Sequence, residues 1–173
     1  LPEAHCYFNH PVKGRGALEA AADVYGIKDY VVDHPDELEK LVAIAGTDIT
    51  VEVRIATPKG KAVYDLSAKF GAAPDDAAEL LKRAQGHGCR TALAFHVGSQ
   101  CLDPAAFRVA MEMARKVADK AGVALEYLDV GGGFPASYKQ DVPPLQSYFD
   151  TIADAKEKLW AGMPLLGEPG RAL

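Results

Sequence analysis

The stretch LEYLDVGGGFP, residues 125–135, runs from a short apolar strand directly into three consecutive glycines. Glycine has no Cβ atom, so the backbone N–H groups of Gly131, Gly132 and Gly133 can approach an anion closely, and these residues can adopt positive φ. A strand that ends in such a turn is suited to binding a phosphate group. Glycine clusters are also common where a strand simply passes into a loop, so the motif gains weight only from what accompanies it.

Two other predicted strands also end in residues that can carry chemistry. One leads into FHVGSQ at 95–100, and the other leads into GEPGRAL at 167–173. We interpret the three strand ends as parts of one site for an anion and a cofactor. This interpretation requires parallel strands, whose carboxyl ends lie on one side of the fold.

Short apolar strands and amphipathic helices alternate along the whole chain. The predicted strands lie at about 4–11, 29–33, 49–55, 91–97, 125–130 and 163–170. The predicted helices lie at about 17–25, 35–45, 74–85, 104–118 and 145–160. Strict alternation of this kind is typical of a parallel sheet with helical crossovers.

The motifs distinguish between the two parallel architectures, an open doubly wound sheet and a (β/α) barrel. A dinucleotide-binding sheet needs G-x-G-x-x-G soon after its first strand, and the chain has neither this motif nor the GKS or GKT of a phosphate-binding loop. Functional residues at the ends of several strands favour the barrel, whose sites lie on its C-terminal face. We therefore predict an α/β fold, a partial (β/α)8 TIM barrel with parallel strands and about six β-α units.

The strand predicted at 49–55, ITVEVRI, alternates strictly between aliphatic and polar residues. Its two faces carry, respectively, Ile49, Val51, Val53, Ile55 and Thr50, Glu52, Arg54. In a barrel ringed by helices, the aliphatic face would meet the helices and the polar face would line the interior. Arg54 would then point inward near the carboxyl end of its strand; the alternative is a solvated arginine on an edge strand.

Composition limits the class of protein. The 173 residues are 49% hydrophobic and 25% charged, as in a soluble globular domain, and the net charge of −5 argues against nucleic-acid binding. No apolar window approaches the roughly 20 residues of a membrane span, and the amino terminus is unlike a signal peptide. Three cysteines without metal-ligand spacing predict free thiols in a reducing cytosol and no metal site.

A phosphate group is bound by backbone N–H donors, hydroxyls and guanidinium groups. The three strand ends supply these types through Gly131–Gly133, Ser99 and Arg171, and Pro169 and Gly170 fix the turn before the arginine. The alternatives are ordinary ones: a serine that caps a helix and an arginine in a surface ion pair. The presence of all these groups, in order, favours the phosphate site.

A flat aromatic ring would fit beside the same strand ends. The small residues Ala92 and Ala94 share a face with His96 and leave room for a ring against the imidazole, unless His96 is simply an interior histidine. The carboxylate of Glu168 would hold an aromatic ring nitrogen in its protonated form. A protonated ring nitrogen is what makes pyridoxal 5'-phosphate an electron sink.

FHVGSQ, LDVGGGFP and GEPGR together resemble the fold-type III (alanine racemase-like) pyridoxal-phosphate decarboxylases that act on ornithine, diaminopimelate, lysine or arginine. The resemblance covers essentially the whole chain, including VRI at 53–55 and LSAKFG at 66–71. GGGFP and FNHPVK look closer to the ornithine branch, and in particular to bacterial ornithine decarboxylase. The function that this resemblance implies is decarboxylation of L-ornithine to putrescine in polyamine biosynthesis, with diaminopimelate, lysine or arginine as alternative substrates.

The resemblance also implies a role for each site residue. His96 stacks on the cofactor ring and Glu168 pairs with the pyridine nitrogen, so these two are the expected catalytic residues. The expected phosphate-binding residues are Ser99, Gly131, Gly132, Gly133 and Arg171, with the turn at Pro169 and Gly170. Arg54 is expected to lie beside the cofactor.

The chain departs from the family pattern in two respects. The lysine that binds the cofactor lies on an early barrel strand without a counterpart here, and Lys13 and Lys69 are poor substitutes for it. The C-terminal β-domain, which contributes site residues partly across a dimer interface, is also absent. Both ends look cut, since there is no initiator Met and the chain stops in mid-pattern. We therefore expect residues 1–173 to be an incomplete, inactive barrel domain of a cytoplasmic protein that forms a homodimer at full length.

Two hypotheses of another kind stay open at the level of sequence. The first is a non-catalytic barrel homologue that binds a phosphate or a partner protein. The second is an open-sheet phosphate-binding protein without a cofactor.

Overall fold

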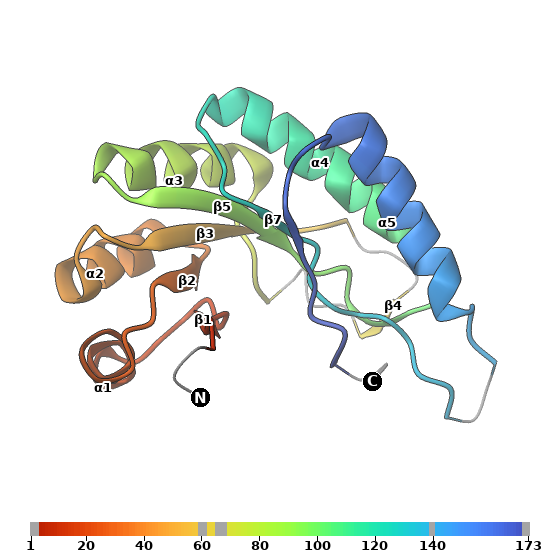
Figure 1. Cartoon of the computed structure of the whole chain (residues 1–173), viewed down its shortest axis with the longest axis horizontal. Coiled ribbons are helices and arrows are strands. Elements are labelled where there is room, and N and C mark those ends of the chain that lie inside the picture. Colours follow the sequence, from red (N-terminus) through yellow and green to blue (C-terminus); the bar gives the residue numbers. More distant parts are fainter. Residues whose placement is uncertain (1–3, 59–61, 65–68, 139–140, 171–173) are drawn as a thin grey trace.

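Six parallel strands form one curved sheet in the order β1-β2-β3-β5-β7-β8 (Figure 1). The computed structural model describes residues 4–58, 62–64, 69–138 and 141–170 of the chain. Each strand of this sheet pairs with the next one along the chain, apart from the intervening β4 and β6. The order never reverses, as it does at the switch point of a doubly wound sheet. The prediction of a partial (β/α) barrel with parallel strands is therefore confirmed.

Most strands of this sheet are short. In chain order they are β1 (Tyr7–Phe8), β2 (Asp29–Val32), β3 (Thr50–Ile55), β5 (Arg90–Phe95), β7 (Leu128–Asp129) and β8 (Leu165–Leu166). A second, antiparallel sheet consists of β4 (Ala62–Tyr64) and β6 (Ser99–Cys101). This small sheet is not apparent from the sequence, because three residues are too few to reveal a two-residue period.

Helices follow the strands of the main sheet and lie along the outside of its curve (Figure 1). They are α1 (Arg15–Glu19), which continues into the π-helical segment η1 (Ala20–Val24), then α2 (Pro35–Ala45), α3 (Pro74–Gly86), α4 (Ala105–Ala121) and α5 (Leu145–Leu159). Proline occupies the first turn of α2 and of α3, where its missing N–H costs nothing. Gly122 ends α4 with φ of +66°.

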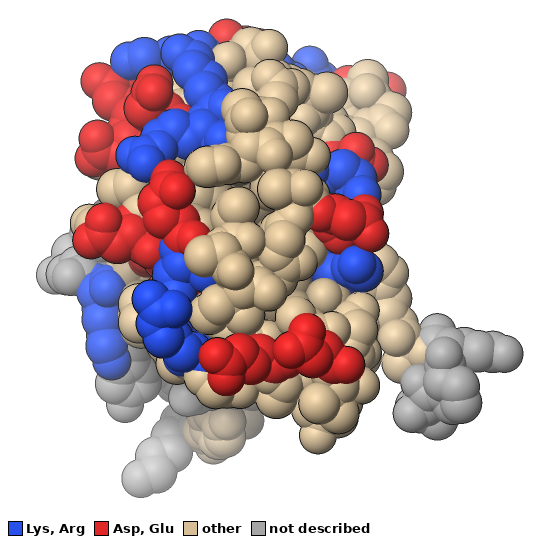
Figure 2. Space-filling view, turned by 90° about the vertical axis from the view of Figure 1, so that its left-hand side faces the viewer, with Lys and Arg blue, Asp and Glu red and all other residues tan. Residues whose placement is uncertain are grey.

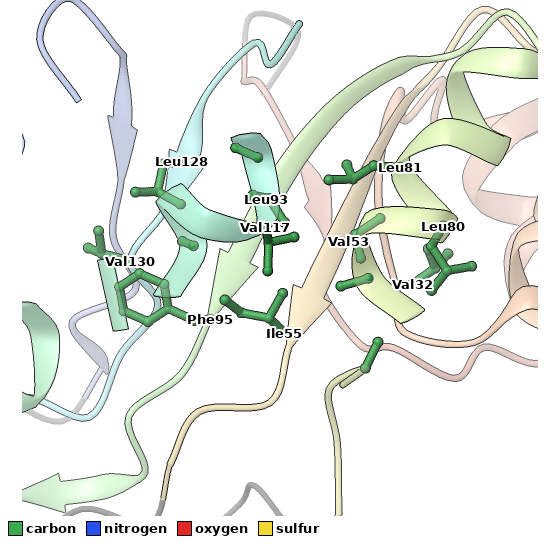
Figure 3. Close-up of a cluster of buried hydrophobic side chains, with 14 of the residues drawn as sticks. Val32, Val53, Ile55, Leu80, Leu81, Leu93, Phe95, Val117, Leu128 and Val130 are labelled. Atoms are coloured by element: carbon green, nitrogen blue, oxygen red, sulfur yellow. The ribbon is translucent and has the colours of Figure 1, made fainter. Parts of the chain in front are cut away.

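The hydrophobic core lies between the outer face of the sheet and the helices (Figure 3). From β3, Val53 lies beside Leu80 and Leu81 of α3, and Ile55 lies nearer to Val117 and Phe95. Helix α4 contributes Val117 to the same cluster. The aliphatic face of β3 thus meets the helices as its alternation predicts, and the polar face of the strand is left for the interior of the curve.

The surface carries a mixture of charges. Figure 2 shows basic and acidic side chains beside one another on one face of the molecule. Lys28 and Arg90 each contact Asp48 at 3.1 Å, and Arg83 contacts Glu39 at 2.7 Å. Exposed pairs of this kind contribute little to stability, because water and salt screen the charges. Within the described part of the chain, none of the helices is long and apolar enough to cross a membrane.

We expect Val117→Ala to lower the free energy of unfolding by about 2 kcal/mol, because it removes two buried methyl groups and leaves a cavity. Val117 is 2% exposed, whereas Val109 of the same helix is 46% exposed. Val109→Ala is the matched control, with the same gain in helix propensity and an expected change within about 0.5 kcal/mol. Urea denaturation of both variants measures the difference, and equal losses would contradict the placement of α4 against the sheet.

Candidate functional site

The ends of β5, β7 and β8 come together at one rim of the half-barrel. The N–H of Glu168 donates to the carbonyl of Gly131 at 2.8 Å, which joins the segment after β8 to the glycines after β7. A Cβ atom built on Gly132 would lie 3.3 Å from Nε2 of His96, which follows β5, and 2.5 Å from the carbonyl oxygen of Glu168. The structure thus brings the imidazole, the glycines and residue 168 side by side.

The glycines are required by how closely backbone segments pass at this rim. A Cβ atom on Gly131 would lie 2.0 Å from the carbonyl oxygen of Phe95, and one on Gly133 would lie 2.3 Å from that of Gly98. Both residues also have positive φ, +66° and +104°. The N–H of Gly131 donates to the Asp129 carboxylate at 2.7 Å. A phosphate site would therefore depend on the N–H groups of Gly132 and Gly133.

The carboxylate of Glu168 is exposed at the rim and oriented by a neighbour. Its Oε1 accepts a hydrogen bond from Nδ2 of Asn9 at 2.6 Å. The same amide nitrogen lies 3.4 Å from Oδ2 of Asp129. Asn9 follows β1, so residues 159 positions apart in the chain meet here. Glu168 is therefore placed to accept a hydrogen bond from a protonated nitrogen of a ligand at the rim.

His96 is neutral in this environment. Its Nδ1 accepts a hydrogen bond from the N–H of Gly98 at 3.0 Å, so in the neutral ring the proton lies on Nε2. Burial and the positive charge of Arg54 lower the pKa of His96, against the opposite effect of Glu168. A neutral imidazole presents a flat face on which an aromatic ring can stack.

Arg54 lies inside the half-barrel. Its strand, β3, lies between β2 and β5, so the alternative of an arginine on an edge strand is wrong. Together with Glu52, His96, Asp129 and Glu168 the residue lines a small cavity. Its guanidinium carbon lies 5.4 Å from the ring centroid of Phe70, a cation–π contact.

For the remaining expected site residues that it describes, the structure gives no direct contact with His96 or Gly132. Ser99 begins β6 and is half-buried opposite Tyr64 of β4. Pro169 and Gly170 follow Glu168 directly, and Gly170 has φ of +40°. Arg171, the expected guanidinium ligand of the phosphate, lies outside the described residues.

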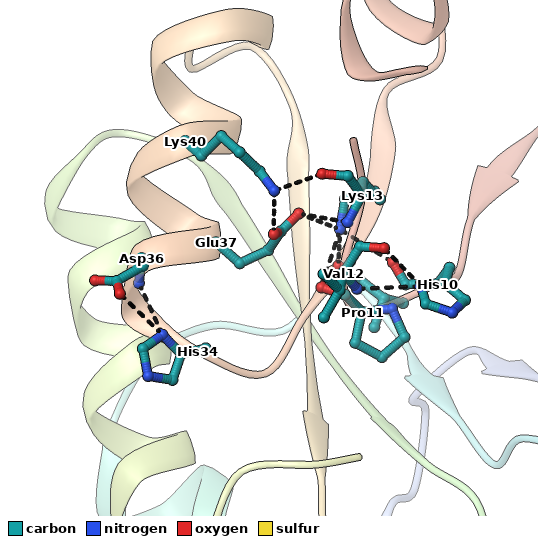
Figure 4. A network of polar contacts seen from close by, with 9 residues as sticks. His10, Pro11, Val12, Lys13, His34, Asp36, Glu37 and Lys40 are labelled. Carbon is teal, nitrogen blue, oxygen red and sulfur yellow. Dashed lines mark hydrogen bonds and ion pairs between the residues drawn. The ribbon is translucent and has the colours of Figure 1, made fainter. Parts of the chain in front are cut away.

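Lys13, the first of the two substitute lysines, is not available to a cofactor at this rim. The side chain of Lys13 is fully buried, and its Nζ contacts Oε1 of Glu37 at 3.0 Å and donates to the carbonyls of His10 and Val31 (Figure 4). Lys40 contacts the other oxygen of Glu37. An amino group whose hydrogen bonds are satisfied in this way has no free direction toward a ligand. Lys69 instead lies with its Nζ 5.3 Å from the centroid of the Phe70 ring.

A layer of acidic groups lies beneath the rim. Asp29, Glu52 and Asp129 are all buried, from β2, β3 and β7 respectively. Burial raises the pKa of Glu52 well above its ordinary value, and the charge of Asp129 adds to this. Burial and the charge of Glu168 raise the pKa of Asp129 to about 7. Carboxylates this close in a poorly solvated interior cannot all be ionised at neutral pH.

Two residues at this site escaped the sequence analysis. Asp129 offered a usable signal, because a carboxylate within an apolar strand is buried and buried carboxylates are rarely unpaired. Asn9 offered none, since its partners lie more than a hundred residues away in the chain. Among the described residues, no group of three or more His, Cys, Asp or Glu side chains is arranged to hold a metal ion.

The donor set fits an aromatic ring that carries a nitrogen. Glu168 offers an exposed carboxylate, His96 a neutral ring, and the small residue Ala94 lines the same cavity as both. Gly132 lets the imidazole and the main chain of residue 168 approach each other closely, because it has no Cβ atom. These residues can bind the ring, orient it and hold a proton at its nitrogen.

Comparison with known proteins gives a consistent result. A family model described as "Pyridoxal-dependent decarboxylase, pyridoxal binding domain" matches residues 2–173. The lysine/ornithine decarboxylase of Selenomonas ruminantium is 38% identical over 170 residues, which are 95% of this chain and 42% of that protein. A crystal structure of a mutant of SrLDC in complex with PLP has a TM-score of 0.88 at 38% identity, covering 95% of this chain and 44% of that one.

A third similar protein was solved with a diamine bound. The lysine/ornithine decarboxylase of Vibrio vulnificus, complexed with putrescine, has a TM-score of 0.82 at 34% identity. The match covers 94% of this chain and 43% of that one. The chain therefore spans about two fifths of the length of the relatives that it matches.

Two features can require a glycine: a positive φ and the close approach of another backbone segment. Gly131→Ala and Gly122→Ala distinguish between them. Both positions have φ of +66°, but a Cβ atom meets nothing within 4 Å at Gly122 and a carbonyl oxygen at 2.0 Å at Gly131. We expect Gly122→Ala to cost about 1–2 kcal/mol of unfolding free energy from its backbone conformation alone. Gly131→Ala should cost at least about 2 kcal/mol more, because the strand ends must move apart. Equal losses in chemical denaturation would show that the close approach is not a constraint.

Proposed function

Since the chain belongs to the pyridoxal-dependent decarboxylases and matches their pyridoxal-binding domain, we propose that the whole protein decarboxylates a basic amino acid. L-ornithine, which yields putrescine, is the first candidate substrate, and lysine is the second. The names of the Selenomonas and Vibrio relatives, which pair lysine with ornithine, support both candidates. Arginine and diaminopimelate remain the alternatives.

The observation that carries this proposal is the convergence of His96, Gly132 and Glu168 at one rim. These groups come from three separate strand ends. Apart from the close packing of the glycines, the fold does not require the His96 and Glu168 side chains to lie together. The chemistry of each group matches one part of pyridoxal 5'-phosphate, which supplies an electron sink when it is bound.

In the proposed mechanism each residue has one task. The carboxylate of Glu168 holds a proton at the ring nitrogen of the cofactor, and Asn9 fixes the direction of that carboxylate. The neutral imidazole of His96 would offer its flat face to the ring and shield it from water. Arg54 adds positive charge beside the site and lowers the pKa of Asp129, against the larger effects of burial and of the Glu168 charge.

A second group of residues would hold the phosphate of the cofactor. We propose the N–H groups of Gly132 and Gly133, the hydroxyl of Ser99 and the guanidinium of Arg171, after the turn at Pro169 and Gly170, as its ligands. Backbone donors and a guanidinium together bind a dianion more tightly than either does alone.

The rest of the protein would complete the site. We propose that the early barrel strands with their lysine and a C-terminal β-domain lie outside residues 1–173, so that these residues are inactive by themselves. The share of each relative that the chain spans, 42% for the Selenomonas enzyme, supports this arrangement. We further propose that the full-length protein is cytoplasmic and forms a homodimer.

Glu168→Ala in the full-length protein should lower kcat by about 10²–10³, the range for loss of one preorganised electrostatic partner of the reacting group. Cofactor affinity should fall much less, about tenfold, because the phosphate contacts remain. Glu126→Ala, at an exposed glutamate away from the rim, is the matched control and should change neither quantity. The visible absorbance of the bound cofactor measures affinity, and an unchanged kcat in Glu168→Ala would contradict the role of this carboxylate.

The full-length protein should release CO2 from ornithine with a higher kcat/KM than from lysine, arginine or diaminopimelate. Diamine products quantified for each substrate give the ranking. A higher value for lysine would change the substrate and leave the reaction class in place. Absence of both visible cofactor absorbance and CO2 release would instead favour the non-catalytic barrel homologue.

A further inference from the structure

Glu52 occupies the centre of the polar interior. The residue is 0% exposed, and its Oε2 accepts a hydrogen bond from the hydroxyl of Tyr127 at 2.9 Å. The same hydroxyl lies 3.3 Å from Oδ1 of Asp29. A phenol has a single proton to donate, and the shorter of the two contacts is the one to Glu52.

The other oxygen of Glu52, Oε1, has no hydrogen-bond donor near it in the described part of the chain. Among the described residues, Oε1 of Glu52 is buried without any hydrogen-bond partner. An ionised carboxylate would need a hydrogen-bond donor at this oxygen. A buried charged oxygen without such a hydrogen bond carries a large desolvation cost. A neutral carboxylic acid would instead need an acceptor, and the carboxylate of Asp129 lines the same small cavity.

The charged and titratable groups that interact with Glu52 are mostly acidic. They are Tyr7, Asp29, Arg54, Tyr127, Asp129 and Glu168. The segment directly after β5 adds His96 at the same cavity. Arg54 is the one strong cation in this set, against three carboxyl groups other than Glu52 itself. The balance of charge therefore favours a proton on one of the buried acids.

These contacts join into a network that runs through the half-barrel. Below, Oδ2 of Asp29 contacts Nε2 of His5 at 2.7 Å, and the His5 side chain is 65% exposed. Above, Asp129 accepts from the N–H of Gly131 and lies 3.4 Å from the Asn9 amide, which in turn donates to Glu168. Asp29 begins β2 and Glu168 follows β8, so the network links the two ends of the parallel strands.

We propose that Glu52 is a neutral carboxylic acid that donates its proton to Asp129, and that it is thereby a positioning residue for Asn9 and Glu168. Tyr127 then donates to the carbonyl-type oxygen of Glu52, and every contact of the acid has a donor and an acceptor. Asp129, held from below, keeps both the Gly131 turn and the Asn9 amide in place. The link to Glu168 rests on the proposed function; the protonation of Glu52 does not.

The electrostatic environment agrees with this assignment. Burial is the largest cause that raises the pKa of Glu52, followed by the charge of Asp129. The side chain of Glu52 acts in the opposite sense on Asp129 and lowers its pKa. One proton shared in this way leaves Asp129 as the acceptor of the pair.

Glu52→Gln tests the protonation state, because an amide reproduces a neutral acid: its oxygen accepts from Tyr127 and its nitrogen donates to Asp129. In the cofactor-free full-length protein at neutral pH, the infrared difference spectrum of wild type minus Glu52→Gln should contain the C=O band of a protonated carboxyl group. Absence of that band would overturn the proposal.

The pH dependence of stability gives a second readout with a definite sign. A raised pKa in the folded state contributes stability that is complete below the unfolded pKa, about 4.3 for Glu, and is lost as the pH rises through the folded pKa. Glutamine does not titrate, so the Tm of Glu52→Gln minus that of wild type should grow as the pH rises above about 4.3. A difference that shrinks with rising pH would mean an ionised Glu52 and would overturn the proposal.

Glu52→Ala tests the positioning role in the holoenzyme. We expect kcat to fall about tenfold, equivalent to about 1.4 kcal/mol, with KM unchanged, and the Gln variant to restore it. Equal kcat for the Ala variant and wild type would overturn the link to Glu168. Failure of the proposed function is distinguishable from failure of this inference. It would appear as an unchanged kcat in Glu168→Ala, while the infrared and Tm results on Glu52 would still hold.

Discussion

The site depends on how closely the end of β7 passes its neighbours. Only a backbone without Cβ atoms can bring Gly131 against the carbonyl of Phe95 and Gly132 against that of Glu168. A side chain at either position would push the end of β7 away from β5 and β8. The imidazole of His96 and the carboxylate of Glu168 would then lie too far apart to hold one ring. Packing of the main chain and geometry of the site are thus the same constraint.

The two faces of the sheet solve opposite problems. The outer face buries aliphatic side chains against α3 and α4 and supplies most of the hydrophobic stabilisation. The inner face carries acids, an arginine and a tyrosine in a layer with little access to water. Such a layer is tolerated only when each polar atom finds a partner. The hydrogen bonds that Tyr127, Asn9 and Gly131 donate provide most of these partners, and the proton proposed on Glu52 would provide one more.

Lys13 and Glu168 illustrate how position decides the use of a charged group. Lys13 is surrounded by main-chain carbonyls and Glu37, so its ammonium stabilises the loop between β1 and α1 and has no free direction toward a ligand. Glu168 has one oxygen held by Asn9 and remains exposed at the rim. A carboxylate that is oriented on one side and open on the other is ready to meet a ligand. The neighbours of Lys13 use its hydrogen-bonding capacity, whereas those of Glu168 leave part of it free for a ligand.

The sequence by itself determined the fold class and singled out His96, Gly131–Gly133 and Glu168, which the structure brings to one rim. The alternation of strands and helices, the strict pattern of ITVEVRI and the three glycines are local features, and local periodicity follows from how a backbone places its side chains. Tertiary structure alone decided that Asn9 meets Glu168, that Gly131 uses its N–H on Asp129, and that Glu52 lies beside Asp129 and Tyr127. These contacts join residues far apart in the chain, and no period in the sequence encodes a distance across the interior of a barrel.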